Sequence, residues 1–197
     1  MDPLLIEVPE RIETERLVLR CPRRGDGATV NAAICASLDE LVPWLPWAVA
    51  TPSVDESEAH CRRQQAKFIL REDFVLLIFA RTADGGEGEF LGGTGLHRID
   101  WELRRFEIGY WRKAGCAGRG IVTEAVQAIS RLAFDALGAR RVEIRTDDNN
   151  VRSWKVAERA GFTLEALLRF DSVTPGGEPR STRVYARVRG AEEPFGP

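Results

Sequence analysis

The sequence predicts one domain of the mixed α/β class, with a mostly antiparallel sheet, one parallel strand pair and about four flanking helices. The chain has 197 residues, of which 44% are hydrophobic and 29% charged, as expected for one soluble domain with a substantial core. Apolar and alternating segments joined by short turns fill residues 74–112, and strands joined in this way pair antiparallel. A strand, a helix and another strand follow over 105–146, and such a crossover makes its two strands parallel. We expect the domain to span residues 1–190 and residues 191–197 to be a disordered tail.

The first third of the chain predicts a strand and two helices. Over residues 13–21, leucines alternate with arginines and a valine, which indicates a first strand. Apolar residues at helical spacing predict a short helix over 28–38. A second helix begins at a capping box formed by Ser53 and Glu56 and is expected to run to about Leu70.

The segment between these helices is expected to be a loop, because Pro43 and Pro46 prevent a helix from continuing. It carries Trp44 and Trp47. The two side chains either pack on the core as a lid or form one wall of a substrate site. An aromatic loop beside a cleft can do both, so the sequence favours neither interpretation.

Three central strands are predicted next. Residues 74–81 are nearly all apolar, as in a central buried strand. A glycine-rich turn leads to a strand over 90–99, and a second turn leads to a strand over 105–112. His97 lies near the end of the middle strand, and the favoured interpretation is a hydrogen-bonded structural histidine.

The strand over 105–112 leads into a loop with Gly115, Gly118 and Gly120, and then into a helix of roughly eighteen residues. Glycines allow a positive φ and a close approach of the backbone to a phosphate. The first N–H groups of a helix have no intrahelical partner and lie at the positive end of its dipole. Arg119 adds a formal positive charge. The segment therefore predicts a site for a diphosphate, since a turn that binds nothing would need only one glycine.

Two other phosphate-binding motifs do not fit this loop. A nucleoside-triphosphate P-loop ends in Gly-Lys-Ser or Gly-Lys-Thr, and the lysine is absent here. A dinucleotide fingerprint requires a third glycine where this chain has Thr123. That difference argues against an oxidoreductase that binds NAD.

The last third of the chain predicts two more elements after the long helix and then a hairpin. Residues 140–146 alternate and are expected to form a strand. A polar run that ends at Asn150 precedes a helix expected over 151–160. Two closing strands are predicted over 162–172 and 180–189.

Three blocks carry a resemblance to a known family. They are the opening TERLVLR, the core EIGYW followed by GRGIVTEAV, and Asn150 and Ser153 followed by ERAGF. Together they resemble the GNAT superfamily over roughly Ile12 to Val188, and most closely its RimJ/RimL-type ribosomal-protein N-acetyltransferases. The resemblance implies the GNAT acyl-CoA N-acyltransferase fold. It also implies an enzyme that moves an acetyl group from acetyl-CoA to a primary amine by direct attack.

The resemblance also implies where acetyl-CoA binds. Backbone groups of Tyr110, Trp111 and Arg112 would pair with the pantetheine arm like an added strand, and Asn150 would reach the cofactor from the later helix. The pyrophosphate would be cradled by Ala117, Gly118, Arg119, Gly120, Ile121, Val122 and Thr123. One departure is Gly115, where many family members have Gln or Arg.

For catalysis, the tyrosine that many GNAT enzymes use as an acid is replaced by Ala157. Ser153 is expected to take its place beside the cofactor thiolate, and its alternative role is a hydrogen bond at the helix start. Glu107 is the preferred base, acting through a water, although it could instead face solvent or pair with Arg105. Asp171 is expected to bind the amine substrate, as are the two loop tryptophans Trp44 and Trp47.

The sequence leaves the amine open. A protein N-terminus, as in the ribosomal-protein enzymes, and a small molecule such as a polyamine, an amino acid or an aminoglycoside-like compound both fit. A competing function is an acyl-CoA-binding sensor that keeps the glycine loop and has little or no catalytic activity. A homodimer is a further expectation.

Composition excludes several other partners. Lys and Arg total 28 against 30 for Asp and Glu, so no basic field indicates a nucleic acid. No apolar run approaches the ~20 residues of a membrane span. The acidic N-terminus is unlike a signal peptide, so we expect a cytoplasmic protein that acts without a membrane. Four scattered cysteines and two histidines predict no metal site.

Overall fold

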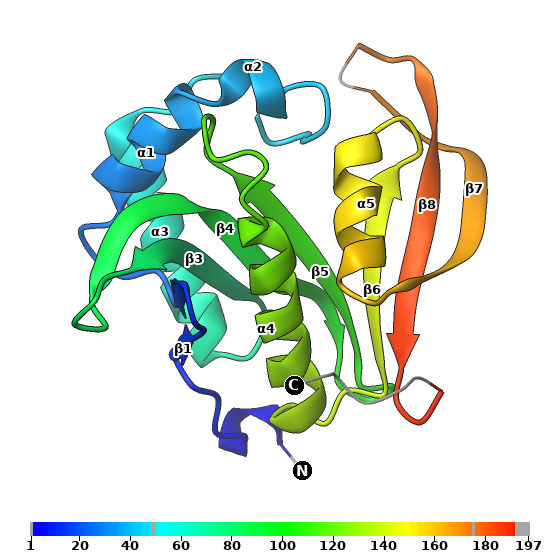
Figure 1. Cartoon of the computed structure of the whole chain (residues 1–197), viewed down its shortest axis with the longest axis horizontal. Coiled ribbons are helices and arrows are strands. Elements are labelled where there is room, and N and C mark those ends of the chain that lie inside the picture. Colours follow the sequence, from blue (N-terminus) through cyan, green and yellow to red (C-terminus); the bar gives the residue numbers. More distant parts are fainter. Residues whose placement is uncertain (1, 49, 175, 192–197) are drawn as a thin grey trace.

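One twisted sheet of eight strands organises the computed structural model, which describes residues 2–48, 50–174 and 176–191 (Figure 1). The strands lie in the order β1-β2-β3-β4-β5-β6-β8-β7, and every neighbouring pair is antiparallel except β5 with β6. Their bounds are β1 Arg11–Glu13, β2 Leu17–Arg20, β3 Phe74–Arg81, β4 Glu87–Asp100, β5 Arg105–Arg112, β6 Arg141–Asp147, β7 Thr163–Val173 and β8 Pro179–Val188. The predicted mixed sheet with one parallel pair is therefore confirmed.

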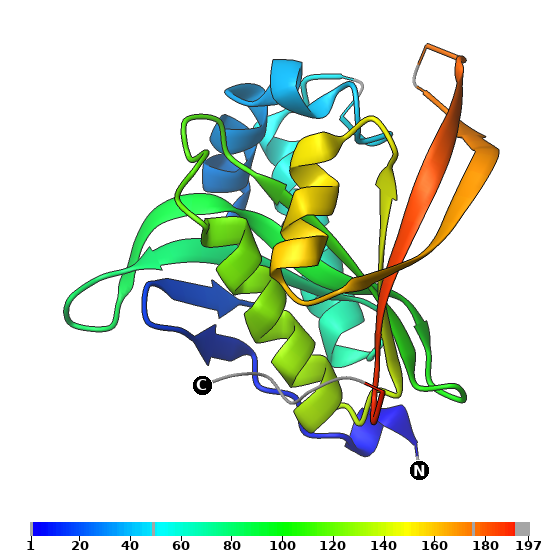
Figure 2. The ribbon, with the colours of Figure 1, turned by 45° about the vertical axis from the view of Figure 1, so that its right-hand side comes forward.

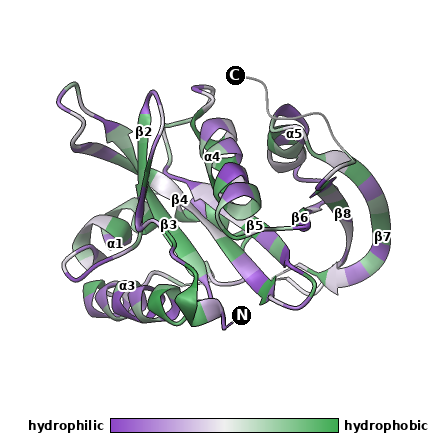
Figure 3. Ribbon diagram, turned by 90° about the horizontal axis from the view of Figure 1, so that it is seen from below, coloured by the Kyte–Doolittle hydropathy of each residue, from purple (hydrophilic) through white to green (hydrophobic). Residues whose placement is uncertain are grey.

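Helices cover both faces of the sheet. Figure 3 shows α1 (Gly27–Cys35) and α3 (Val54–Ile69) on one face, with α4 (Ile121–Asp135) and α5 (Val151–Arg159) on the other. The single turn α2 (Leu38–Leu41) lies beyond α1, and a 3₁₀ turn over Pro3–Leu5 begins the chain. None of the helices formed by the described residues is both long enough and apolar enough to cross a membrane. The predicted tail, residues 192–197, lies outside the part of the chain that the structure describes.

Several boundaries differ from the sequence prediction. The helix expected over 28–38 ends at Cys35, because Ser37 leaves helical geometry at φ −119° and its hydroxyl bonds the Ala33 carbonyl. Residues 38–41 then form α2, so the described residues contain five α-helices, one more than expected. The long helix α4 is also shorter than predicted and ends at Asp135, three residues before a glycine in the left-handed conformation. Strand β1 was not predicted, since three residues are too few to show a period.

Strand β2 is buried on both faces although its residues alternate in character along the sequence. All four of its residues are buried, because helices pack on both sides of the sheet. Arg20 is buried at 5% exposure, since Asp26 accepts hydrogen bonds of 2.7 Å from both of its terminal nitrogens. Its guanidinium also lies 4.7 Å from the ring centre of Phe79. A buried charge with a bidentate partner is thus compatible with a strand that looks amphipathic in the sequence.

Helices α1 and α3 touch at Gly27, where an added Cβ would lie 2.4 Å from the Cα of Glu58. The Glu58 carboxylate accepts hydrogen bonds from the N–H groups of Gly25 (3.0 Å) and Gly27 (2.9 Å), so it caps the start of α1 from another helix. The Gly25 N–H is the largest cause, followed by Arg62, of a Glu58 pKa lowered to about 2.

We predict that Glu58→Gln weakens the fold in a pH-dependent way. A folded pKa of about 2 means that the ionised carboxylate stabilises the native state above the unfolded pKa. That contribution is lost as the pH falls from about 5 toward the folded value. The melting temperature of the variant should therefore lie below that of the wild type at pH 7, and the difference should shrink toward pH 2. Glu72→Gln, at an exposed position, is the control and should show neither effect. A difference that is constant with pH would contradict the assignment.

Strands β5 and β6 separate soon after they meet. They pair at only three positions, from Arg105 with Arg141 to Glu107 with Glu143, whereas β5 continues to Arg112. Figure 1 shows the two strands diverging toward the end of β5, and Figure 2 shows α5 beside this gap with the β7–β8 hairpin rising beyond it. The gap lies at the end of β5 from which the glycine loop leads into α4.

Candidate active site

The glycine loop has the backbone that the sequence predicts. Gly115, Gly118 and Gly120 have φ values of 79°, 76° and 72°, a region that other residues rarely adopt. Gly120 is the N-cap of α4 and supplies no side-chain hydrogen bond, so the first N–H groups of the helix have no cap from it. The loop and the first turn of α4 border a cleft of about 1560 Å³. This geometry fits the diphosphate of CoA.

An ion-pair clamp fastens the loop to the start of the chain. Glu124, in the first turn of α4, accepts hydrogen bonds from the hydroxyl of Thr14 (2.5 Å) and from Nε of Arg16 (2.7 Å). Arg16 also donates from Nη1 to the carbonyl of Arg119 at 2.9 Å. Sequence reasoning missed this clamp because its partners are more than 100 residues apart. It gives the TERLVLR and GRGIVTEAV blocks a shared physical role.

The positive charge of the cleft comes from a different place than expected. The Arg119 side chain is exposed and is not among the residues that line the cleft. Instead, the cleft is lined by Arg11, Arg16, Arg112 and Arg131 and by three cations of α5, Arg152, Lys155 and Arg159, whose spacing places them on one side of the helix. This helical spacing of three cations was the signal from which the cationic side of α5 could have been predicted. Cations beside a glycine loop fit a ligand with several phosphates.

The backbone of β5 has an open side. Beyond Glu107, no residue of β6 pairs with it, so the β6-facing side of Tyr110, Trp111 and Arg112 has no strand partner. Successive side chains of a strand point to opposite faces, and Trp111 packs on the α3 side against Phe90, with ring centres 5.9 Å apart. An extended ligand arm can therefore lie along β5 like an added strand, as the family resemblance implies.

The start of α5 brings Asn150, Ser153 and Tyr110 together. The side-chain oxygen of Asn150 accepts a hydrogen bond from the backbone N–H of Ser153 at 3.1 Å, which caps the helix. The Tyr110 hydroxyl donates to the Ser153 carbonyl at 2.9 Å and lies 3.1 Å from the Ser153 hydroxyl. Burial raises the pKa of Tyr110 to about 12, and its hydrogen bond with Ser153 offsets part of that effect. Ala157 is buried on the same helix. Ser153 and Tyr110 thus present two neighbouring hydroxyl groups beside the strand gap.

Two further cavities continue from the cleft beside the glycine loop, which we call the cofactor cleft. The gap cavity, of about 540 Å³, lies between β5 and β6. The α3-side cavity, of about 820 Å³, lies between α3 and strands β3 to β5. The cofactor cleft and the gap cavity share Arg112, Val122, Arg152 and Val156. The gap cavity and the α3-side cavity share Leu45, Arg98, Glu107, Gly109, Tyr110 and Trp111. A passage therefore runs from the α4 face through the gap to the α3 face, and two substrates can meet from opposite sides.

Glu107 lies where the two cavities of this passage meet. Its carboxylate accepts a hydrogen bond from Arg98 at 3.1 Å, whereas the ion-pair partner of Arg105 is Asp100 at 3.7 Å. The alternatives of a pair with Arg105 and of a solvent-facing side chain were therefore wrong, since only 19% of the side chain is exposed. Burial raises the pKa of Glu107, and Arg98 and Arg145 offset part of that rise. A carboxylate with a raised pKa is suited to accept a proton.

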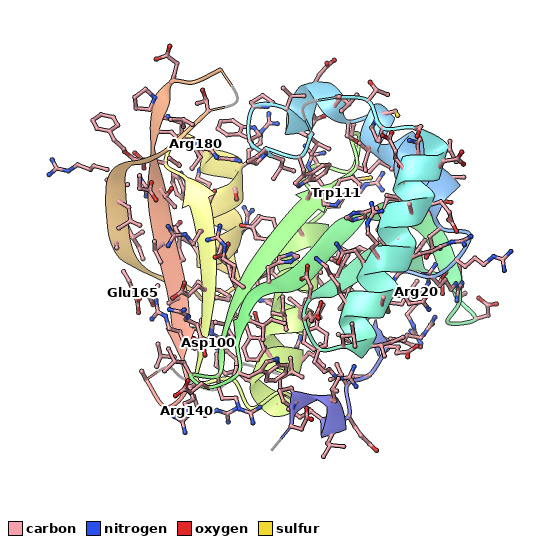
Figure 4. All side chains as sticks on the ribbon, turned by 180° about the vertical axis from the view of Figure 1, so that it is seen from behind. Arg20, Asp100, Trp111, Arg140, Glu165 and Arg180 are labelled. Atoms are coloured by element: carbon pink, nitrogen blue, oxygen red, sulfur yellow. The ribbon has the colours of Figure 1, made fainter. Side chains whose placement is uncertain are left out.

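The three residues expected to contact the amine all border the passage. Trp47 lines the α3-side cavity and meets Trp111 edge-on, with ring centres 6.0 Å apart. Trp44 and Asp171 line the gap cavity, and Asp171 accepts a hydrogen bond from Arg145 at 3.2 Å. Figure 4, seen from the α3 side, shows Trp111 on β5 and Arg180 on β8, on the two sides of the strand gap. The sequence analysis did not predict that Arg98 pairs with Glu107 or that Arg145 pairs with Asp171.

Among the described residues, no group of three or more His, Cys, Asp or Glu side chains is placed to hold a metal ion.

Comparison with known proteins agrees with this geometry. The family model for the acetyltransferase (GNAT) domain matches residues 16–163. YdaF of Bacillus subtilis (strain 168), named for a proposed ribosomal N-acetyltransferase activity, is 37% identical over 159 residues, which cover 79% of this chain and 82% of that protein. The ribosomal-protein-serine acetyltransferase of Escherichia coli (strain K12) is 30% identical over 127 residues, covering 64% of this chain and 69% of that protein.

A solved structure of RimL, an α-N-protein acetyltransferase in complex with coenzyme A, has a TM-score of 0.83 at 23% identity and covers 93% of this chain and 100% of its own. The chain belongs to the GNAT acetyltransferase family. Within that family it is of the RimJ/RimL type, an N-acetyltransferase that depends on acetyl-CoA. This membership favours an enzyme over a sensing protein.

We predict that Glu124→Gln weakens acetyl-CoA binding. The substitution removes the charge that holds Arg16 against the glycine loop. A hydrogen bond to a charged group contributes ~1.5–3 kcal/mol, so the KM for acetyl-CoA should rise about tenfold or more while kcat changes little. Steady-state kinetics measures both constants. Glu165→Gln, which breaks an ion pair with Arg141 at the far edge of the sheet, is the matched control. A KM within twofold of the wild type would show that the clamp does not position the loop.

Proposed function

We propose that this enzyme acetylates the α-amino group of a protein, and that Glu107 and Ser153 carry the chemistry. The observation that supports this most directly is the position of Glu107 on the passage where the two substrates would meet. The names of the relatives support the substrate class, since YdaF and the Escherichia coli enzyme are named for ribosomal proteins.

The reaction requires one bond to form and one to break. Acetyl-CoA supplies an acetyl thioester, and the lone pair of the neutral amine forms the C–N bond as the C–S bond breaks and its electron pair leaves on the thiolate. The glycine loop and the open side of β5 would hold the two ends of the cofactor. Glu107 first takes the proton of the ammonium ion through a water, which frees this lone pair. After the C–N bond has formed, the second N–H proton passes to the thiolate by way of the Ser153 hydroxyl at the positive end of α5, so the serine is again a hydroxyl at the end.

The dimensions of the passage favour a peptide end over a small amine. The α3-side cavity alone is about 820 Å³, and it joins the gap cavity of about 540 Å³. Trp47 at 50% exposure and Phe170 at 75% exposure offer apolar contacts for the residues that follow an N-terminus. Phe170 directly precedes Asp171, whose carboxylate can attract an ammonium group.

A panel of amines tests the substrate class. Short peptides with free N-termini, the same peptides with blocked N-termini, a polyamine, a free amino acid and an aminoglycoside are incubated with acetyl-CoA, and thiol release is measured. We expect free peptides to be the best substrates and blocked peptides to be inactive. Turnover confined to the small amines would replace this proposal with the small-molecule alternative. Acetyl-CoA binding without turnover of any amine would favour the sensing alternative.

We predict that Glu107→Gln lowers kcat about 100-fold, the usual size of a general-base contribution. The fold should not suffer. Because the pKa of Glu107 is raised in the folded protein, the native state binds this proton more tightly than the unfolded chain does. Protonated Glu107 therefore stabilises the fold below the pKa of the unfolded chain, and this contribution is lost as the pH rises through the folded pKa. At pH 7 the variant should therefore melt at or above the wild-type temperature. A lower melting temperature together with unchanged kcat would contradict both parts.

We predict that Ser153→Ala lowers kcat about tenfold with little change in the KM for acetyl-CoA, since a hydrogen bond to a charged group contributes ~1.5–3 kcal/mol. The helix should remain, because Asn150 caps it through the backbone N–H of residue 153, which alanine keeps. Ser153→Thr retains a hydroxyl and is the matched control, which should recover most of the activity. If both variants were equally active, the hydroxyl would have no catalytic part.

The proposal retains two expectations from the sequence, a cytoplasmic location and a homodimer. The first is consistent with a substrate class that includes ribosomal proteins. The second is measured directly by size-exclusion chromatography with light scattering.

A further inference from the structure

His97 lies in the amine passage and is held by a carboxylate. It comes from β4 and lines the α3-side cavity, and its Nδ1 lies 2.6 Å from Oδ1 of Asp73 in the loop before β3. The side chains are 35% and 19% exposed, so the pair is partly shielded from water. A structural hydrogen bond, as the sequence suggested, is present. The exposure of the ring toward the cavity is more than that role requires.

The sheet is built to make room for this imidazole. Gly95 and Gly109 lie opposite each other on β4 and β5. A Cβ at Gly95 would lie 2.8 Å from Nε2 of His97, and a Cβ at Gly109 would lie 3.0 Å from the same atom. The ring therefore extends over both glycines, toward the end of β5 where the strand gap opens. Nε2 is thus aimed along the sheet toward the gap beside β5.

The tautomer follows from the Asp73 contact. A carboxylate accepts a hydrogen bond, so Nδ1 of the neutral ring carries the proton and Nε2 keeps its lone pair. Among the described residues, none donates a hydrogen bond to Nε2. The lone pair is therefore available to a proton in the passage.

Glu107 is the residue directly opposite His97 in the register of β4 and β5. Residues paired in this way have Cβ atoms ~5 Å apart and share a face of the sheet. The charged and titratable groups around them are Asp73, Arg98 from β4, Glu143 and Arg145 from β6, and Glu56, His60 and Arg63 from α3.

Charge balance decides where the proton of the amine should rest. If Glu107 kept it, His97 would stay neutral and the Asp73 carboxylate would have no cation beside it in this pair. If His97 takes it, the imidazolium is paired with Asp73 and the Glu107–Arg98 pair stays intact. The side chains of Asp73 and Glu107 are each only 19% exposed, and a shielded carboxylate is more stable beside a cation than without one. The second arrangement leaves every charge with its partner.

We propose that His97 is a catalytic residue of this enzyme, the final acceptor of the amine proton, and that Asp73 orients it. The inference rests on the proposed function and assigns the base of that same site more fully. The ammonium N–H bond breaks, the proton passes by way of Glu107 to Nε2, and Glu107 is again a carboxylate when the nitrogen attacks. The imidazolium then returns its proton to solvent through its exposed side.

Imidazole NMR tests the geometry without turnover. The chain has two histidines, so His60→Asn leaves the signals of His97 alone. We expect neutral His97 to be the Nδ1–H tautomer and Asp73→Asn to change the tautomer or its population. An Nε2–H tautomer in the wild type would overturn the proposal, whatever the enzyme acetylates.

Kinetics tests the role. His97→Asn keeps a donor near Asp73 and removes the base at Nε2. With the best peptide substrate, we expect kcat/KM to fall about 100-fold. Wild-type activity should decline at acidic pH, where a protonated imidazole cannot accept the proton, and this acid limb should shift to lower pH in the variant. Added imidazole should restore part of the rate, which it would not do for a damaged fold. His60→Asn is the control and should retain the acid limb.

The outcomes separate the two proposals. If His97→Asn stays within twofold of the wild type with the same acid limb, His97 is structural and Glu107 alone is the base. If no amine is turned over, the proposed function fails, and the tautomer still decides whether His97 is presented as an acceptor. Acetyl-CoA binding, measured by calorimetry, should be unchanged in His97→Asn, and its loss would also contradict the assignment.

Discussion

The divergence of β5 and β6 is the constraint on which the site depends. Two parallel strands that remained paired would satisfy each other's backbone groups and close the sheet. Here the pairing stops after Glu107 and Glu143, so the rest of β5 exposes backbone groups toward a gap. That gap joins the cleft under α4 and α5 to the cavity under α3. The enzyme can therefore bring a large cofactor and an amine together from opposite faces of one sheet.

Each side of this gap is held by contacts between distant parts of the chain. Glu124 ties the glycine loop to residues near the N-terminus, and Tyr110 ties β5 to the first turn of α5. Asp171 reaches from β7 to Arg145 of β6. These contacts hold the loop, the strand and the helix in a fixed relation, as a preorganised site requires.

The passage itself is lined by paired charges. Glu107 has Arg98, Asp171 has Arg145, and His97 has Asp73. A proton that enters this network changes which pairs are satisfied, so the energetic preference for one acceptor depends on the partners of all of them. The two pKa shifts that bear on the chemistry, at Glu107 and Tyr110, both arise first from burial.

The sequence by itself determined the order of the elements, the parallel crossover and the glycine loop, because each depends on local periodicity, turn residues or backbone freedom. The strand over 74–81 and the capping box at Ser53 needed nothing from the rest of the chain. The resemblance of its motifs also suggested Glu107 as the base and Ser153 as the residue beside the thiolate, and it left the role of the loop tryptophans open. Only the tertiary structure decided that Arg98, and not Arg105, pairs with Glu107, that α5 adds three cations to the cofactor cleft, and that Asp73 meets His97. Those partners lie on different elements. The register of β4 against β5 and the packing of helices on both faces of the sheet bring them together, and such non-local contacts produce no repeating pattern in the sequence.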